Sequence, residues 1–163
     1  MNLIETPEII DWPEMHYVYV EKVGLFQETA PAAWEEMHAH IPEIVPHISH
    51  HAALYKVEPQ MIYRAGLGVD DRPDMLPPGV KYTLFAGGKY KQFTLTGSYA
   101  QLPEACGLVF GWLEANNIQL RDEFCIENYV NNPRSTPEEE LITQILMPVA
   151  NPGLITITQP FKA

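Results

Sequence analysis

Residues 97–117 read GSYAQLPEACGLVFGWLEANN, and this stretch decides the fold that the sequence predicts. Its apolar residues recur at steps of three and four positions, which is typical of a helix with one apolar face. The residues at these steps are Leu102, Ala105, Val109, Trp112 and Leu113. Asn116-Asn117 indicates where the helix ends, and Gly97 separates it from the strand-like residues before it.

A similar arrangement occurs 73 residues earlier in the chain, where Gly24-Leu25-Phe26 corresponds to Gly97-Ser98-Tyr99. Each glycine follows a strand-like run and precedes a predicted helix. Each helix carries a tryptophan on its apolar side, Trp34 in the first and Trp112 in the second. The chain therefore contains an internal repeat.

Runs rich in aromatic and β-branched residues predict the strands. They lie at residues 15–23, 60–69, 80–86, 89–96, 124–130 and 141–149. Gly87-Gly88 predicts a hairpin turn that pairs the third of these strands with the fourth. The first helix is predicted to begin near Pro31, which a first helical turn tolerates, and to end at Pro42.

The sequence thus predicts a strand–helix–strand–strand pattern in two halves, about 15–88 and 89–149. Residues 1–14 are predicted to be an N-terminal extension. Residues 150–163 are predicted to be a C-terminal extension, whose Leu154-Ile155-Thr156-Ile157-Thr158 alternation favours an edge strand or a contact with a homodimer partner. A duplicated pattern usually folds about a pseudo-two-fold axis. We therefore predict an α+β fold, with antiparallel sheets around that axis and a central ligand groove at the joint.

The charge balance limits the classes of partner that the protein is expected to bind. Ten lysine and arginine residues stand against 21 aspartate and glutamate residues, a net charge of −11. Surfaces that bind phosphate need clustered basic side chains, so we expect no direct nucleic-acid binding and no anionic membrane as a partner. Small-molecule ligands, cationic or neutral, remain as candidate partners.

The compartment is predicted from cysteine usage and from targeting patterns. Cys106 and Cys125 lack metal-ligand spacing and are expected to be reduced thiols. The first 14 residues contain no signal-peptide pattern, and no apolar run reaches the length of a membrane span. The sequence therefore predicts a cytoplasmic protein.

Several short motifs, in their order and spacing, resemble the GyrI-like small-molecule-binding domain. This domain is also the effector module of AraC-type and MerR-type multidrug regulators. The motifs are Tyr63-Arg64-Ala65-Gly66, Ala86-Gly87-Gly88-Lys89-Tyr90, Gly97-Ser98-Tyr99, Trp112-Leu113, Glu127-Asn128-Tyr129 with Asn132-Pro133, and Glu140-Leu141 running to Met147-Pro148-Val149. The resemblance extends from about residue 15 to residue 149.

The resemblance implies a deep aromatic pocket on the pseudo-two-fold axis. It implies that Glu127 is a floor carboxylate for cationic aromatic compounds and that Phe26 and Tyr99 are wall positions. Phe26 stands where tyrosine is expected, so no hydroxyl is available there. Leu76-Pro77-Pro78-Gly79 does not align readily with the entrance loop, and residues 150–163 extend past the usual end of the family.

Independently of the resemblance, period-two alternation places Cys125 and Tyr129 on the same strand face as Glu127. Burial of an unpaired carboxylate is costly, so Glu127 is either a pocket carboxylate or an ordinary surface charge on an exposed face. The aromatic residues are either pocket lining or core packing. The candidates, with the first three preferred, are Tyr99, Tyr129, Phe26, Tyr63, Trp34 and Trp112.

A metal site is not predicted, although five histidines lie close together in the sequence. Residues 41–53 are expected to be irregular and hold His47, His50 and His51, while His38 and His40 precede them. Zinc sites usually need a third ligand in fixed geometry, so these histidines are interpreted as solvated or pocket-rim residues. No nucleophile motif or phosphate loop is present, and no cofactor is expected.

Three functions follow from these observations and the resemblance. The first is a stand-alone binding protein that senses or sequesters hydrophobic, cationic aromatic molecules. The second is a hydrolase of strained, cyclopropanoid-type electrophiles, in which Glu127 activates water and Tyr129 donates a hydrogen bond. The third is a protein-interaction module such as a gyrase inhibitor. Whether the protein is an enzyme is left open, and a binding protein is favoured.

Overall fold

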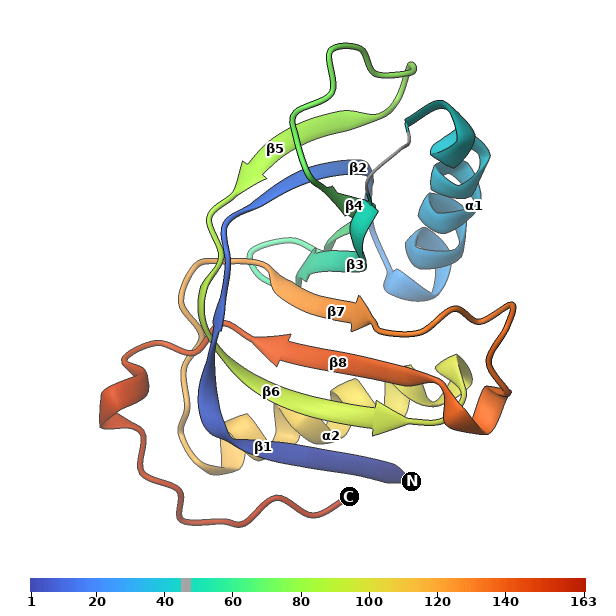
Figure 1. Cartoon of the computed structure of the whole chain (residues 1–163). Helices are drawn as coiled ribbons and strands as arrows, with labels where there is room; N and C mark the ends of the chain where they lie inside the picture. Colours follow the sequence, from blue (N-terminus) through green and yellow to red (C-terminus); the bar gives the residue numbers. More distant parts are fainter. Residues whose placement is uncertain (45–47) are drawn as a thin grey trace. The chain divides into compact units, whose positions relative to one another are not determined.

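The computed structural model describes residues 1–44 and 48–163 and divides the chain into two compact units (Figure 1). The continuous unit is Pro13–Gly87, and the split unit combines Met1–Trp12 with Gly88–Ala163. His47, which was considered as a metal ligand, lies outside the described residues. No helix of the described part is both long and apolar enough to cross a membrane.

The continuous unit is a four-stranded antiparallel sheet with one helix. Its elements are β2 (Met15–Val23), α1 (Phe26–Ile44), β3 (Ile48–Lys56), β4 (Ile62–Val69) and β5 (Lys81–Phe85). The strand order is β3-β4-β2-β5, and α1 packs against β2 and β4. Buried aromatic and aliphatic residues of β2 and β4 form the core of the unit.

Close packing in this sheet depends on a glycine of β4. Gly66 pairs with Tyr19 of β2 and with Ala52 of β3. The buried Tyr17 side chain passes over it and donates a hydrogen bond of 2.7 Å to the carbonyl oxygen of Ala52. A Cβ atom at Gly66 would lie 2.4 Å from Tyr17 Cζ and 2.5 Å from the carbonyl oxygen of Val18. Only glycine fits this position.

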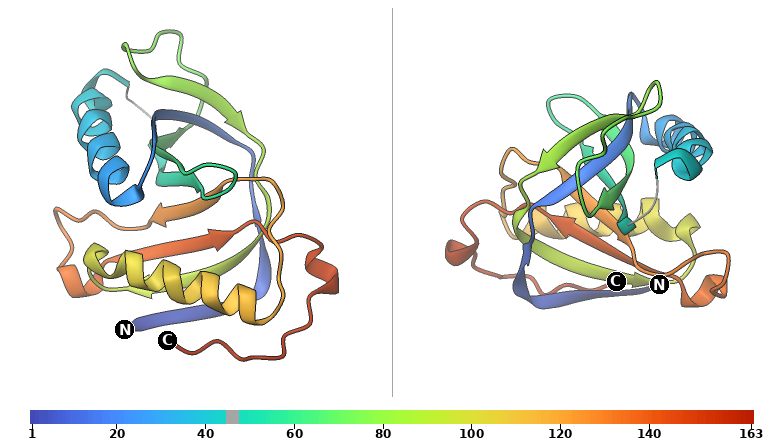
Figure 2. Two further views of the ribbon diagram at one scale, coloured as in Figure 1. Left: turned by 180° about the vertical axis from the view of Figure 1, so that it is seen from behind. Right: turned by 45° about the horizontal axis from the view of Figure 1, so that its top comes forward.

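The split unit also contains a four-stranded antiparallel sheet and one long helix. Its elements are β1 (Asn2–Trp12), β6 (Gly88–Thr96), η1 (Tyr99–Gln101), α2 (Leu102–Ala115), β7 (Cys125–Tyr129), η2 (Glu138–Glu140), β8 (Ile142–Met147) and η3 (Pro152–Leu154). The strand order is β1-β6-β8-β7. Figure 2 shows α2 lying across one face of this sheet.

The duplication is confirmed by the two sheets. The repeated strand–helix–strand–strand pattern is β2-α1-β3-β4 in the continuous unit and β6-α2-β7-β8 in the split unit. Within each sheet the third strand of the pattern lies between the other two, and an additional strand, β5 or β1, flanks the first. Gly24 and Gly97 hold equivalent positions with φ of 131° and 142°, which suits glycine at both strand–helix junctions. The predicted α+β fold is therefore correct.

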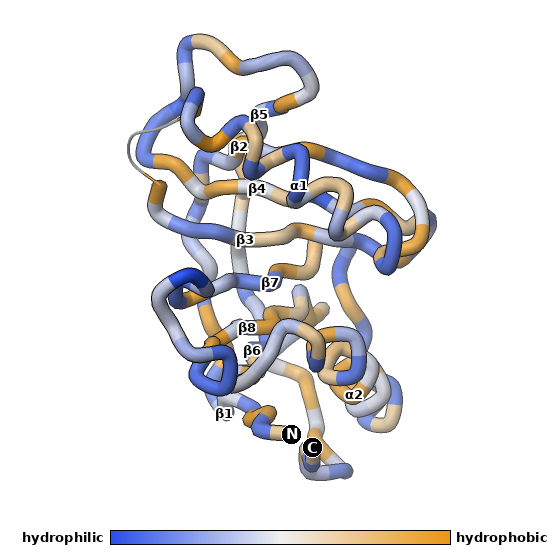
Figure 3. Tube along the Cα trace, turned by 90° about the vertical axis from the view of Figure 1, so that its right-hand side faces the viewer, coloured by the Kyte–Doolittle hydropathy of each residue, from blue (hydrophilic) through white to orange (hydrophobic). Residues whose placement is uncertain are grey.

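The strand assignment in the first half was wrong at β3. Residues 41–53 were predicted to be irregular, yet α1 continues past Pro42 to Ile44 and β3 begins at Ile48. Along β3 the tube in Figure 3 turns from blue to orange, because the strand sequence ISHHAALYK passes from hydrophilic Ser49-His50-His51 to hydrophobic Ala52-Ala53-Leu54. Because the polar half of β3 lacks a strand-like pattern, the sequence did not reveal it.

The predicted hairpin through Gly87-Gly88 is also wrong. The strand before the two glycines, β5, pairs with β2, whereas the strand after them, β6, pairs with β1 and β8. Both glycines have positive φ, 74° and 116°, but they connect the two units instead of closing a hairpin. A local turn signal does not specify which strands pair.

Residues 1–14, predicted as an extension, contain β1 instead. Its register with β6 shifts between Glu5 and Ile9, and the buried Lys91 of β6 fills this irregularity. Lys91 Nζ forms an ion pair with Glu5 at 2.7 Å and donates a hydrogen bond of 2.8 Å to the carbonyl oxygen of Thr6. The bulge interrupts the alternation from which a strand is recognised.

Candidate functional site

Glu127 lies in the middle of β7, opposite Ile145 of β8. Its side chain is only 9% exposed, so the interpretation as a surface carboxylate is excluded. Tyr129 Oη donates a hydrogen bond of 2.8 Å to Glu127 Oε1, and the Cys106 thiol on α2 donates one of 3.4 Å to Glu127 Oε2. The carboxylate is therefore held at both oxygens, from its own strand and from the helix that covers the sheet.

The environment of Glu127 favours its neutral form, while its hydrogen bonds favour the charged form. Burial raises the pKa of the Glu127 carboxyl, and the hydrogen bonds from Tyr129 and Cys106 act in the opposite direction. No basic side chain of the described residues forms an ion pair with it. Other partly buried or buried charges of the chain do have such partners, as Arg64 has Glu21 at 2.8 Å. Within residues 1–44 and 48–163, Glu127 is thus a buried carboxylate with no cationic partner.

Tyr99 extends this arrangement by one ring. It begins η1, where the Ser98 hydroxyl accepts a hydrogen bond of 3.1 Å from the Ala100 amide. The Tyr99 ring meets the Tyr129 ring edge to face, with centroids 5.3 Å apart. Its hydroxyl is buried and has no hydrogen-bond partner among the described residues, and burial raises its pKa. We refer to Cys106, Glu127, Tyr129 and Tyr99 as the Glu127 cluster.

The continuous unit has an aromatic group of its own. Phe26, the first residue of α1, lies 5.5 Å from the Tyr55 ring and 5.8 Å from the Tyr63 ring. The Trp34 indole donates a hydrogen bond of 2.8 Å to the Tyr63 hydroxyl, and its ring lies 5.4 Å from that of His38. The structure therefore brings together three residues that the sequence had marked, Phe26, Tyr63 and Trp34.

Trp112 lies apart from the Glu127 cluster. Its indole nitrogen donates a hydrogen bond of 2.7 Å to the carbonyl oxygen of Gln159, and its ring contacts Phe93 and Phe161 edge to face at 5.6 and 5.9 Å. These contacts hold the C-terminal residues against α2. They correspond to core packing, which was the alternative weighed for this tryptophan.

Two residues of these groups were missed from the sequence. Cys106 follows Leu102 by four positions on the apolar side of α2, so the helical periodicity could have placed it toward the sheet. Tyr55 lies in β3, which was not predicted as a strand, and no pattern marked it.

The histidines do not assemble a metal site in the described part of the chain. No three His, Cys, Asp or Glu side chains of residues 1–44 and 48–163 are grouped so that they could hold an ion. His50 and His51 lie on β3, where burial lowers the pKa of both, and the nearby His38 lowers that of His51 further.

Comparisons with known proteins agree with this architecture. A family model described as the GyrI-like small molecule binding domain matches residues 5–150. A search of curated proteins found no significant match. Among solved structures, the C-terminal domain of EcmrR is similar with a TM-score of 0.75 and 15% identity, over 92% of this chain and 99% of that one.

Two further solved structures have a similar fold. The structure of SAV2435 bound to tetraphenylphosphonium has a TM-score of 0.72 and 16% identity, over 88% of this chain and 93% of that one. A structure described as a hydrolase from Listeria innocua has a TM-score of 0.54 and 15% identity, over 88% and 91%. At these identities the likeness shows the shared fold.

Proposed function

The chain belongs to the GyrI-like small-molecule binding domain family, and on that premise we propose that it binds hydrophobic aromatic cations, with Glu127 as the counter-charge. One observation carries the proposal. The Glu127 carboxylate is buried, is oriented by two hydrogen-bond donors and has no basic partner among the described residues. A cationic ligand supplies the missing charge.

The chemistry of the Glu127 cluster favours a delocalised cation over a compact one. An ammonium ion is strongly hydrated and loses much hydration energy on burial, whereas a cation spread over aromatic rings loses less. The Tyr99 and Tyr129 rings add cation–π attraction, worth about 0.5–2 kcal/mol for each well-placed ring. The protein's net charge of −11 also attracts cations and repels nucleic acid.

The ligand of a structural neighbour supports the same class of compound. Tetraphenylphosphonium, bound by SAV2435, carries one positive charge surrounded by four aromatic rings. We propose that this chain accepts ligands of that chemistry.

Thermal unfolding with added ligand tests the proposal. A ligand that binds only the folded state raises Tm by mass action, by an amount that grows with ligand concentration. We expect tetraphenylphosphonium to raise Tm and triphenylphosphine oxide, a neutral compound with three phenyl rings on phosphorus, to raise it much less. Equal shifts for the two compounds would remove the argument from charge.

Hydrolysis of a strained electrophile is a second candidate, favoured by the burial that raises the pKa of Glu127. A carboxylate with a raised pKa is a better general base for water, and the Tyr129 hydroxyl, 2.8 Å from Oε1, orients it. Turnover of a cyclopropanoid compound by the wild type, lost in Glu127→Gln, would support this function. Stoichiometric binding without product would exclude it.

A further inference from the structure

The C-terminal segment, residues 150–161, is fastened to the split unit at its end. Asn116 Oδ1 accepts hydrogen bonds of 2.8 Å from the amides of both Thr158 and Gln159. The Trp112 indole binds the Gln159 carbonyl oxygen, and the Phe161 ring lies 5.0 Å from that of Phe93. The segment is therefore a fixed part of the unit, although it extends beyond the residues that the family model matches.

The middle of this segment is extended and exposed, and its backbone is unpaired. Leu154 is 81% exposed and Ile157 is 45% exposed. Residues 155–157 belong to no strand, in contrast to the edge strand that the alternation favoured. Their amides and carbonyls make no hydrogen bond with any residue of the described chain. An extended stretch of β-branched residues with free backbone groups is a template for another strand.

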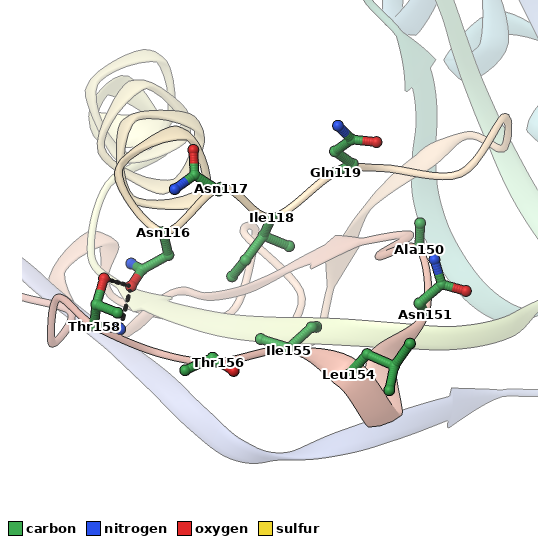
Figure 4. Close-up of a pocket in the computed structure, with 10 residues that line it drawn as sticks. All are labelled: Asn116, Asn117, Ile118, Gln119, Ala150, Asn151, Leu154, Ile155, Thr156 and Thr158. Carbon is green, nitrogen blue, oxygen red and sulfur yellow. Dashed lines mark hydrogen bonds between the residues drawn. The ribbon is translucent and has the colours of Figure 1, made fainter.

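A groove of about 420 Å³ runs beside this stretch (Figure 4). Ile118 of the connection after α2 and Ile155 of the C-terminal segment lie on its opposite walls. All residues that line it are uncharged: Asn116, Asn117, Ile118, Gln119, Ala150, Asn151, Leu154, Ile155, Thr156 and Thr158. The groove therefore offers apolar and amide surface to an extended chain.

The charge distribution restricts what can approach this surface. The chain carries a net charge of −11, so two copies repel each other over most of their surfaces. Residues 141–161 contain no charged side chain. The C-terminal segment and the lining of the groove beside it therefore bring no charged side chain of their own to a contact between two copies.

The segment is also complementary to itself. In an antiparallel pair centred on Thr156, that residue faces its own copy, and Ile155 of each chain faces Ile157 of the other. Paired β-branched residues stabilise such a ladder, and a two-fold axis makes the contact isologous.

We propose that residues 155–157 form a two-stranded antiparallel pairing with the same residues of a second copy of this chain. Ile155 of each copy and Ile157 of the other exchange hydrogen bonds through their unpaired backbone groups, and the contact covers Ile157. Three residues from each copy bury less than the roughly 1,200–2,000 Å² of a standard stable interface, so the dimer is weak and depends on concentration.

Sedimentation equilibrium of the full chain over a concentration series tests the pairing. Thr156→Lys places two like charges opposite each other at the two-fold axis and is expected to weaken dimerisation about tenfold or more. Thr156→Glu is expected to do the same, whereas an equal mixture of the two variants restores a mixed dimer. Ser135→Lys, on an exposed loop of the same unit, adds the same charge and leaves dimerisation unchanged.

Cross-linking tests the register. Opposite residues of an antiparallel pair have Cα atoms about 4.5–5.5 Å apart, within the range that a disulfide spans. Thr156→Cys should therefore give a covalent dimer under mild oxidation, and Ser135→Cys should not.

Three results would overturn the inference. The first is a wild-type chain that stays monomeric up to about 1 mM, the limit of weak specific affinity. The second is a dimer that Thr156→Lys leaves unchanged. The third is a groove that takes up an unrelated peptide or small molecule while the chain stays monomeric.

Discussion

Replacing Tyr129 with phenylalanine removes one of the two donors that hold Glu127. The hydroxyl lies 2.8 Å from Glu127 Oε1, and the substitution leaves the ring and its contact with Tyr99 in place. The carboxylate then keeps only the longer hydrogen bond from Cys106, 3.4 Å from Oε2. The change therefore removes a hydrogen bond from a buried carboxylate.

The expected size follows from the strength of that bond. A hydrogen bond to a charged group contributes about 1.5–3 kcal/mol. Because that bond favours the charged form, its loss should raise the pKa of the Glu127 carboxyl further above its ordinary range. For a chain of this length, a loss of 1 kcal/mol lowers Tm by about 2–4 °C.

The sign of the pH effect is set by the direction of the shift. Because the folded pKa of Glu127 lies above its unfolded value, this group destabilises the fold as pH rises through that interval. In Tyr129→Phe the interval extends to higher pH. The variant should therefore lose little stability at about pH 3, below the ordinary glutamate range, where the carboxyl is protonated in the folded and the unfolded state. Once the pH exceeds the folded pKa of Glu127 in the variant, the loss should reach about 1.5–3 kcal/mol, or about 3–12 °C in Tm.

Titration calorimetry with tetraphenylphosphonium between about pH 5 and pH 9 measures the same shift through binding. We expect the pH midpoint at which affinity for the cation appears to move to higher pH in Tyr129→Phe. Tyr99→Phe is the matched control, because the Tyr99 hydroxyl has no hydrogen-bond partner among the described residues. An unchanged midpoint in Tyr129→Phe, or an equal shift in both variants, would refute the role assigned to this hydrogen bond.

Three further predictions concern stability. Gly66→Ala places a Cβ atom within 2.5 Å of the Tyr17 ring and the Val18 carbonyl oxygen. Because a backbone atom cannot move aside easily, we expect urea unfolding to show a free energy of unfolding lower by about 3 kcal/mol or more, or no soluble protein. Asn116→Ala removes the side-chain amide that binds the C-terminal segment and should lower the free energy of unfolding by about 2–3 kcal/mol. Amide hydrogen exchange should become faster at residues 158–159. Unchanged protection of these amides would contradict the role of Asn116. Glu127→Gln carries no buried charge, so its Tm should rise relative to wild type between pH 4 and pH 8; a constant difference would show that the carboxyl does not titrate in this range.

The sequence sufficed for the duplicated fold because its signals were local and occurred twice. The periodicity of α2 and the two glycines, Gly24 and Gly97, define equivalent strand–helix junctions. The pairing of the strands was harder to predict from the sequence. Gly87-Gly88 has the residues of a hairpin turn, yet β5 and β6 pair with other strands, because pairing is decided by burial over the whole sheet.

The strand that carries the candidate site could be predicted from the sequence, but the residues that surround Glu127 could not. Alternation placed Glu127 and Tyr129 on one face of β7, and the hydrogen bond between them agrees with that placement. Alternation does not say whether that face is covered, so burial of the carboxylate could not be decided. Coverage comes from α2 through Cys106, and contacts between distant elements leave no pattern in a single sequence.

Trp112 and the C-terminal segment illustrate the same limit. Trp112 was marked as an aromatic candidate, but residues 40 and more positions away determine its surroundings through Gln159 and Phe161. The alternation after Leu154 suggested a strand, and the chain there is extended without a partner in its own unit. A strand pattern indicates a tendency to pair, and the structure shows whether a neighbour is present.

The central claim is that the Glu127 charge selects a cationic ligand. Isothermal titration of Glu127→Gln with tetraphenylphosphonium and with triphenylphosphine oxide at pH 8 tests it most directly. Glu114→Gln, an exposed glutamate on α2, removes the same net charge as a control. We expect Glu127→Gln to lose about ten- to a hundredfold in affinity for the cation, about 1.4–2.8 kcal/mol, with little change for the neutral compound and none in Glu114→Gln. Equal losses for both compounds, or an unchanged affinity for the cation, would contradict the account.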